Sequence, residues 1–261
     1  MEYKLPVALE PFRTELNATR KLFVRAKAAS SKEVSPWSSK VGGIPYFPKV
    51  GSWPTSREGT PLYFLAQINF EEMPSLSPFP SKGIVQFFIG DDDLYGMDFD
   101  DGENQDHFRV IYYPELISDL NLLYDSIPTS TEDYELLPHH PEDTFALQYS
   151  IEEEILPVTD YHFSERFGAG FFQQFGEKEW EVYEDFGRKV RSDGHKIGGY
   201  AYFTQDDPRR LEDPMLLLFQ LDSDEKMDLM WGDMGVGHFF IRATDLERRD
   251  FSRVLYDWDC L

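Results

Sequence analysis

The feature that most constrains this fold is an internal repetition. The stretch SKVGGIPYFPKVG at residues 39–51 returns as HKIGGYAYFTQDD at residues 195–207. Two further blocks recur in the same order: YFLAQINFE resembles LLLFQLDSD (216–224), and GIVQFFI (83–89) resembles GVGHFFI (235–241). The spacing between the copies changes by only a few residues from block to block. Three ordered matches indicate a duplicated architecture in which each half folds in the same way.

The repeated blocks have the composition of strands. Residues 61–70 and 83–90 are apolar runs of the kind that form interior strands, and Gln67 is the one polar side chain that looks buried in the first run. Prolines and paired glycines over about residues 40–54 predict an ordered aromatic loop there, and neither a helix nor a central strand. Residues 108–113 and 145–154 alternate in the manner of strands. We therefore expect an α+β fold that is strand-rich: an internally duplicated antiparallel or mixed sheet assembly with peripheral helices.

Helical spacing appears outside the repeated blocks. Apolar residues fall near helical positions over 8–29, and aromatic residues recur at three-or-four spacing over 163–191, where glycines predict a break into two pieces. The tail reads as a short helix with Thr244 or Asp245 as its N-cap, followed by a final strand. We expect residues 1–34 to form an N-terminal helix packing on the body, 35–160 the first half, and 161–261 a linking helix and the second half, all in one compact unit.

The charge balance limits the classes of partner. With 25 Lys and Arg against 48 Asp and Glu, the net charge is −23. Such a surface repels phosphate, so neither nucleic acid nor a membrane is expected as a partner. The charge suits a basic protein partner, or it serves only to keep the protein soluble. The sequence leaves the oligomeric state open.

Targeting and cysteine usage favour a cytoplasmic location. The N-terminus lacks the design of a secretory signal, and no apolar run approaches the length of a membrane span. Cys260 is the only cysteine, which excludes an internal disulfide.

The segment DDDLYGMDFDDGENQD at 91–106 carries eight acidic residues and no basic one. Clustered carboxylates attract calcium, but aligning Gly102 with the EF-hand glycine would place Met97 and Phe99 at ligand positions. A solvated acidic loop is therefore favoured over a cation site. The six histidines lack zinc-site spacing, and no phosphate-binding or nucleophile motif occurs, so no metal, cofactor or catalytic residue is assigned.

One polar constellation remains as a candidate binding site. Its members are His195, Gln205, Asp207, Gln220, Asp222, Ser223, Trp231 and Asp233. An amide beside carboxylates and an indole is how proteins recognise sugars or peptides, and Asp222 with Asp233 could act as the acid and base of glycoside hydrolysis. A structural interpretation is favoured, because Gln67 and Gln220 occupy equivalent positions in the two copies and would each satisfy loop backbone groups. A specialised site is expected first at the polar end of the second copy, Gln205–Asp207, which has no counterpart in the first.

The same stretches, SKVGGIPYFP…WP…GTPLYFLAQINF and HKIGGYAYFTQDDP…LLLFQLDSD…WGDMGVGHFFI, resemble the YwqG-like family of bacterial domains from about residue 35 to the C-terminus. The resemblance implies no established activity. Through gene neighbourhood it suggests an immunity role beside polymorphic toxins. Two hypotheses follow. The first is a non-enzymatic cytoplasmic interaction protein that covers the basic cleft of a toxin with its acidic loop. The second is a protein that binds or hydrolyses a small polar ligand, such as a sugar or peptide.

Overall fold

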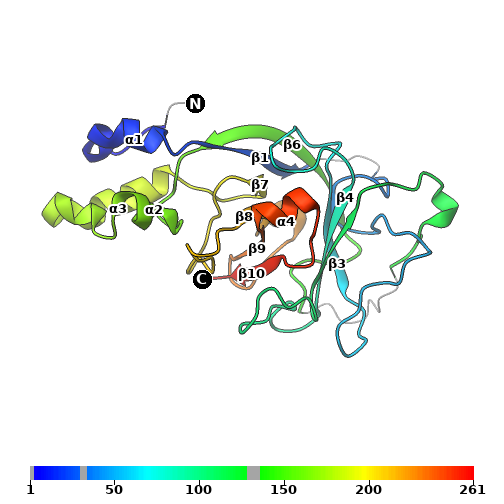
Figure 1. Ribbon diagram of the computed structural model, residues 1–261. Coiled ribbons are helices and arrows are strands. Elements are labelled where there is room, and N and C mark those ends of the chain that lie inside the picture. Colours follow the sequence, from blue (N-terminus) through cyan, green and yellow to red (C-terminus); the bar gives the residue numbers. More distant parts are fainter. Residues whose placement is uncertain (1–2, 30–33, 128–135) are drawn as a thin grey trace.

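The fold is built on one curled, ten-stranded sheet (Figure 1). The computed structural model describes residues 3–29, 34–127 and 136–261. The strand order is β10-β9-β8-β7-β1-β6-β2-β3-β4-β5, and every neighbouring pair is antiparallel. Four α-helices lie within the described residues. The strand-rich α+β fold expected from the sequence is thereby confirmed.

The strands are β1 (Lys21–Ala28), β2 (Lys40–Gly42), β3 (Tyr63–Asn69), β4 (Ile84–Ile89), β5 (Arg109–Tyr113), β6 (Thr144–Glu154), β7 (Lys196–Gly198), β8 (Leu216–Asp222), β9 (Val236–Ile241) and β10 (Leu255–Asp259). Six of them, β2–β4 and β7–β9, lie in the repeated blocks. The expectation that residues 40–54 hold no central strand is wrong at β2, which pairs with β6 and β3 because the prolines of this stretch begin only at Pro45. The helices are α1 (Arg13–Asn17), α2 (His162–Phe167), α3 (Glu179–Lys189) and α4 (Ala243–Arg248), with 3₁₀ turns at Val7–Phe12, Leu120–Leu122, Phe171–Lys178 and Glu225–Met227.

The two halves interleave at the centre of the sheet. Strands β2–β5 and β7–β10 form the same antiparallel meander. Strand β1 precedes the first meander in the chain but pairs with β7 of the second, and β6 precedes the second but pairs with β2 of the first. Strands β1 and β6 also pair with each other from Lys21↔Glu154 to Ala28↔Leu147. Each meander is therefore completed by the strand that leads into the other. The division of the chain at residues 34 and 160 stays a prediction.

Both halves contribute side chains to one hydrophobic core. Phe87 of β4 lies 5.1 Å from Phe219 of β8 and 4.5 Å from Phe239 of β9, measured between ring centroids. All three rings are fully buried. Burial of a ring of this size stabilises a fold by about 1.5–3 kcal/mol, so these contacts couple the two meanders directly.

The helix expected over residues 8–29 is wrong for most of its length. Only Val7–Asn17 is helical, and Lys21–Ala28 is β1. Strand β1 lies between β6 and β7 and forms backbone hydrogen bonds on both sides. This pairing overrides the weak helical spacing of its apolar residues. The expected N-caps are also wrong, since α4 begins after Arg242 and no side chain caps it.

The helical segment 163–191 is confirmed, broken at its glycines. Gly168 separates α2 from the following 3₁₀ turn, and Gly176 interrupts that turn, with φ of 89° and 56° respectively. Helices α1–α3 lie beside the sheet, away from β3 and β4 (Figure 1). They bury a small aromatic core of their own that includes Phe163, Phe172 and Phe186. In the part of the chain that the structure describes, no helix has both the length and the apolar character needed to cross a membrane.

Candidate functional site

Both halves carry a Gly-Gly turn that folds the following loop back over the sheet. In the second half, Gly198 and Gly199 have φ of 71° and 75°, a conformation open to glycine at little cost. The Gln220 Oε1 then accepts from the Tyr202 N–H at 2.8 Å, and its Nε2 donates to the Ser192 and Gly194 carbonyls.

The first half repeats this arrangement. The Gln67 Oε1 accepts from the Tyr46 N–H at 2.9 Å, and its Nε2 donates to the carbonyls of Pro36 and Ser38. Both amides are fully buried. The hydrogen bonds to loop backbone that the duplication predicted for Gln67 and Gln220 are therefore present in both halves, and they belong to the shared framework.

The two halves differ in the residue that packs on the aromatic rings beside this framework. Trp53 of the first half packs on Phe47 and Phe88, and its Nε1 donates to the Leu62 carbonyl at 2.8 Å. In the second half Arg209 takes that place.

The Arg209 guanidinium lies over the rings of Phe203 and Phe240, which are the counterparts of Phe47 and Phe88, and donates to the Met215 carbonyl. An aromatic core position of one half is thus a buried cation in the other.

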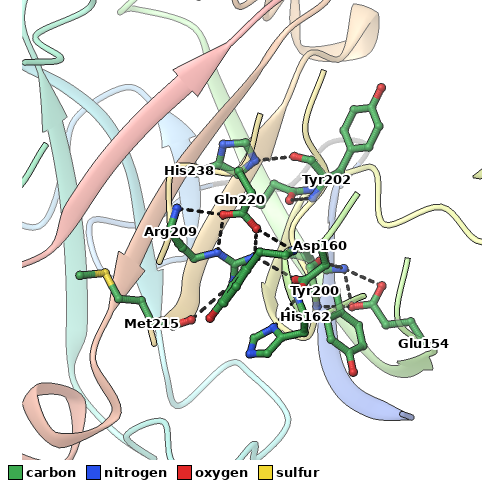
Figure 2. Close-up of polar contacts among 12 residues, drawn as sticks. Glu154, Asp160, His162, Tyr200, Tyr202, Arg209, Met215, Gln220 and His238 are labelled. Carbon is green, nitrogen blue, oxygen red and sulfur yellow. Dashed lines mark hydrogen bonds and ion pairs between the residues drawn. The ribbon is translucent and has the colours of Figure 1, made fainter. Parts of the chain in front are cut away.

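Arg209 is neutralised by two carboxylates (Figure 2). Its Nη2 lies 2.9 Å from Asp160 Oδ2 and 2.7 Å from Asp207 Oδ2, and all three side chains are almost completely buried. The second oxygen of Asp160 accepts from His162 at 2.7 Å. Burial alone would raise the pKa of Asp160, but the bond from His162 and the charge of Arg209 hold it below its usual value. The cluster ties the start of α2 to the loop beyond the second Gly-Gly turn.

A second buried ion pair supports that turn. The Lys196 Nζ donates to both oxygens of Glu154, at 2.6 and 2.7 Å, and to the Tyr200 carbonyl at 2.7 Å. Glu154 in turn accepts from the Tyr200 N–H (Figure 2). Burial lowers the pKa of Lys196 to about 8, against the opposing charge of Glu154. These groups are fully occupied with one another, which favours a structural role.

An acidic pocket of about 630 Å³ opens beside Arg209, between residues 97–103, residues 208–215 and β10. Its ionisable lining comprises the carboxylates Asp98, Asp100, Asp101, Glu103, Glu212, Asp213 and Asp257 and the cations Arg209 and Arg210. Arg209 is already paired with carboxylates outside the lining. Arg242, from outside the lining, pairs with Glu103 and Asp213. The remaining carboxylates leave the pocket negatively charged.

Asp257 is the least solvated carboxylate of this lining, with 21% of its side chain exposed. Burial raises its pKa to about 7, and the charges of Asp259 and Asp207 add to the shift. Behind it, the Nδ1 of the fully buried His238 lies 3.9 Å from Asp257 Oδ2. His238 Nε2 contacts the Tyr202 carbonyl at 2.6 Å, and burial lowers the pKa of His238 to about 3. Asp257 is therefore a poorly solvated carboxyl group at the pocket, with its pKa raised by burial and by neighbouring carboxylates.

The acidic segment 91–106 is anchored across the second half. The Trp258 Nε1 donates to the Leu94 carbonyl, the Tyr256 N–H to the Gly102 carbonyl, and the Gln105 amide to the Phe251 carbonyl, each at 2.8 Å. At its tip, Asp100 and Asp101 are exposed. The segment is thus held as a wall of the pocket, with carboxylates presented to solvent.

None of the eight residues nominated from the sequence lines this pocket. His195, Asp222 and Ser223 lie together: His195 Nδ1 accepts from the Asp222 N–H at 3.0 Å, and the Ser223 Oγ donates to the Gly235 carbonyl. Asp222 accepts from the Gly194 N–H at 2.6 Å, and burial raises its pKa to about 6.

The other nominated residues lie apart from that group. Trp231 is fully buried against Tyr95 and Trp258, whereas Asp233 is exposed. Asp207 binds Arg209, as described above, and the exposed Gln205 donates to the Cys260 carbonyl. A binding role for the eight residues stays a prediction.

Sequence reasoning missed Arg209, Asp160 and Asp257. A signal in the sequence was available for Arg209, because comparing the repeated halves position by position places it opposite Trp53. Asp257 corresponds to Ile111 through the sheet, since Gln86 and His238 are equivalent and pair with Ile111 and Asp257.

Over residues 3–29, 34–127 and 136–261, no three His, Cys, Asp or Glu side chains are grouped closely enough to hold a metal ion.

Comparison with known proteins places most of the chain in one family. Residues 39–260 match the family model described as a domain of unknown function, DUF1963. No curated protein matches the chain.

Proposed function

The chain belongs to the DUF1963 family, whose description assigns no function, and we propose that this member binds a basic segment of a partner protein in its acidic pocket. The observation that carries the proposal is the pocket itself. It gathers seven carboxylates from both halves of the chain, and it includes one, Asp257, in whose place the first half has Ile111. A concave site whose unpaired charges have one sign selects ligands of the opposite sign.

The charge of the whole molecule supports the same reading. A net charge of −23 attracts a basic partner over distances of about 10 Å at 0.1 M salt and speeds encounter. A toxin with a basic cleft is one partner of this chemistry. The sequence motifs around the two Gly-Gly turns support the narrower assignment to the YwqG-like family, and with it the immunity-type role that belongs to this proposal.

The alternative of a small-ligand binder or hydrolase has one observation in its favour. Asp222 has a raised pKa of about 6, which suits a general acid, and His195 lies beside it. The Asp222 carboxylate, however, already accepts a hydrogen bond from the Gly194 N–H, and Trp231 is fully buried. The acidic pocket therefore gives the stronger support, and the hydrolase hypothesis stays open to an activity assay on Asp222→Asn.

Co-purification tests the proposed function. The pocket variant combines Asp100→Asn, Asp101→Asn and Glu212→Gln, three exposed residues of the lining. The matched control combines Glu177→Gln, Glu179→Gln and Glu181→Gln, three exposed residues of the segment around α3. Both variants remove the same charge. We expect the tagged wild-type protein and the control variant to retain a basic partner protein from cell extract. The pocket variant should retain at least tenfold less of that partner. Equal retention by both variants would contradict the proposal.

A further inference from the structure

We infer that the acidic pocket receives a single arginine side chain, whose guanidinium contacts Asp257 at the floor and Phe99 at the rim. The inference rests on the proposed function and narrows it to one type of side chain. Three observations carry it: the contrast with the pocket beside β5, the carboxylate of Asp257, which lacks a hydrogen-bond donor, and the exposed aromatic ring at the mouth.

The duplication supplies an internal comparison. Strand β5 corresponds to β10, and a pocket of about 530 Å³ lies beside it, lined also by Arg249, Phe251 and Ser252 from the other half. Ile111 lies there in place of Asp257, and the cations Arg109 and Arg249 lie there with the single carboxylate Asp106. The two strands hold corresponding places in the fold, yet only the pocket beside β10 is strongly acidic. The fold therefore does not require a carboxylate at the position of Asp257.

Asp257 has no hydrogen-bond donor among the described residues. The nearest polar group behind it is the fully buried His238 Nδ1, at 3.9 Å, which itself has no hydrogen-bond partner in that part of the chain. A poorly solvated carboxylate without a donor is unfavourable, and a cation entering from the open side would relieve it. Asp257 therefore favours a ligand group that carries both a positive charge and N–H donors.

The rim distinguishes arginine from lysine. Phe99 is 76% exposed, lies between Asp98 and Asp100, and belongs to the pocket lining. The walls include Met97, Met215 and Leu255, against which an aliphatic stem would pack. A planar guanidinium stacks on an aromatic face while it binds carboxylates with several donors, whereas an ammonium group is compact and strongly hydrated.

The same half already shows this mode of recognition inside the protein. The Arg209 guanidinium lies 4.7 Å from the centroid of Phe240 and 4.8 Å from that of Tyr161 while it pairs with Asp207 and Asp160. A ligand arginine held between Phe99 and Asp257 would be bound by the same combination of stacking and carboxylate contacts.

Titration of the full-length protein with N-acetyl-arginine amide and N-acetyl-lysine amide tests the inference. Calorimetry or NMR would follow binding to the wild type, Asp257→Asn, Phe99→Ala and the control Asp93→Asn, which removes one exposed charge of the same segment outside the pocket. We expect the arginine compound to bind the wild type at least tenfold more tightly than the lysine compound. Asp257→Asn should weaken arginine binding at least tenfold, Phe99→Ala should abolish the preference for arginine, and Asp93→Asn should change neither.

Equal binding of the two compounds, no binding of either, or unchanged arginine binding by Asp257→Asn would overturn the inference. These failures are separable from failure of the proposed function. If the co-purification variants behave as expected while Asp257→Asn does not, a basic partner binds without an arginine at the floor. Thermal melts show whether each variant is folded. If Asp257→Asn is not folded, Phe99→Ala, which changes an exposed position, still tests the inference.

Discussion

Among single residues that differ between the halves, Asp257 has the clearest consequence for stability. Its folded pKa is about 7, against an ordinary value of 3.8. Between these two pH values the folded state holds a proton that the unfolded state releases, so the free energy of unfolding falls as pH rises through this window. Asp257→Asn should remove that fall and raise the free energy of unfolding at pH 8 by about 2–4 kcal/mol. Urea denaturation at pH 5 and pH 8 measures the effect, and an unchanged pH slope would contradict it.

His238 has the opposite effect on how stability depends on pH. Its folded pKa is about 3, against an ordinary value of 6.5, so the unfolded state binds a proton first and stability is lost as pH falls through that window. His238→Gln installs the residue of the first half, where the Gln86 Nε2 donates to the Tyr46 carbonyl. We expect near wild-type stability at pH 7 and about 2–3 kcal/mol less acid loss at pH 4. Thermal melts at the two pH values decide it; an equal acid loss in both proteins would refute the assignment.

What the sequence revealed at this scale depended on repetition. Gln67 and Gln220 were recognisable as framework residues because they recur, and a recurring residue serves the shared fold. The position of Arg209 opposite Trp53 could be read from the repeat, but its burial could not be predicted, because Asp160, which balances its charge, lies far from it in sequence and meets it only through the fold. Pairing of this kind leaves no local pattern.

At the scale of elements, buried strands were more predictable than β1. The runs that became β3, β4, β8 and β9 are apolar because the sheet is covered on both sides, and that composition does not depend on the order of the strands. Strand β1 has exposed residues at Lys21 and Leu22 and contains both Lys and Arg. Only its place between β6 and β7 makes it a strand, and this exchange between the halves cannot be derived from local periodicity.

The Gly-Gly turn gives a prediction for this scale. A Cβ on Gly199 would overlap the Glu154 carboxylate, lie 2.8 Å from the Phe23 Cβ, and require φ of 75°. Gly199→Ala should therefore reduce the free energy of unfolding by about 3 kcal/mol or more. Gly59→Ala is the matched control, since Gly59 also has positive φ but faces open space, and it should cost about 1 kcal/mol. Chemical denaturation compares the two, and losses of equal size would show that the Lys196–Glu154 pair does not confine the turn.

At the scale of the whole molecule, the strand exchange makes each half depend on the other. A chain divided into residues 1–127 and 136–261 would leave β1 without β7 in one fragment and β6 without β2 in the other. We expect neither fragment alone to unfold cooperatively, and a mixture of the two to recover a cooperative transition. Circular dichroism of the separate and mixed fragments measures this. Cooperative unfolding of an isolated fragment would mean that one meander is stable without its borrowed strand.

The corresponding strands β10 and β5 form the two edges of one sheet, and of the pockets beside them only the one at β10 is strongly acidic. The most direct test of the binding account is hydrogen exchange of the full-length protein with and without hexa-arginine. The account predicts slower exchange in residues 97–103, 208–215 and 255–257 and unchanged exchange in residues 105–106, 249 and 251–252, which line the pocket beside β5. Equal protection at both pockets, or protection only elsewhere, would contradict it.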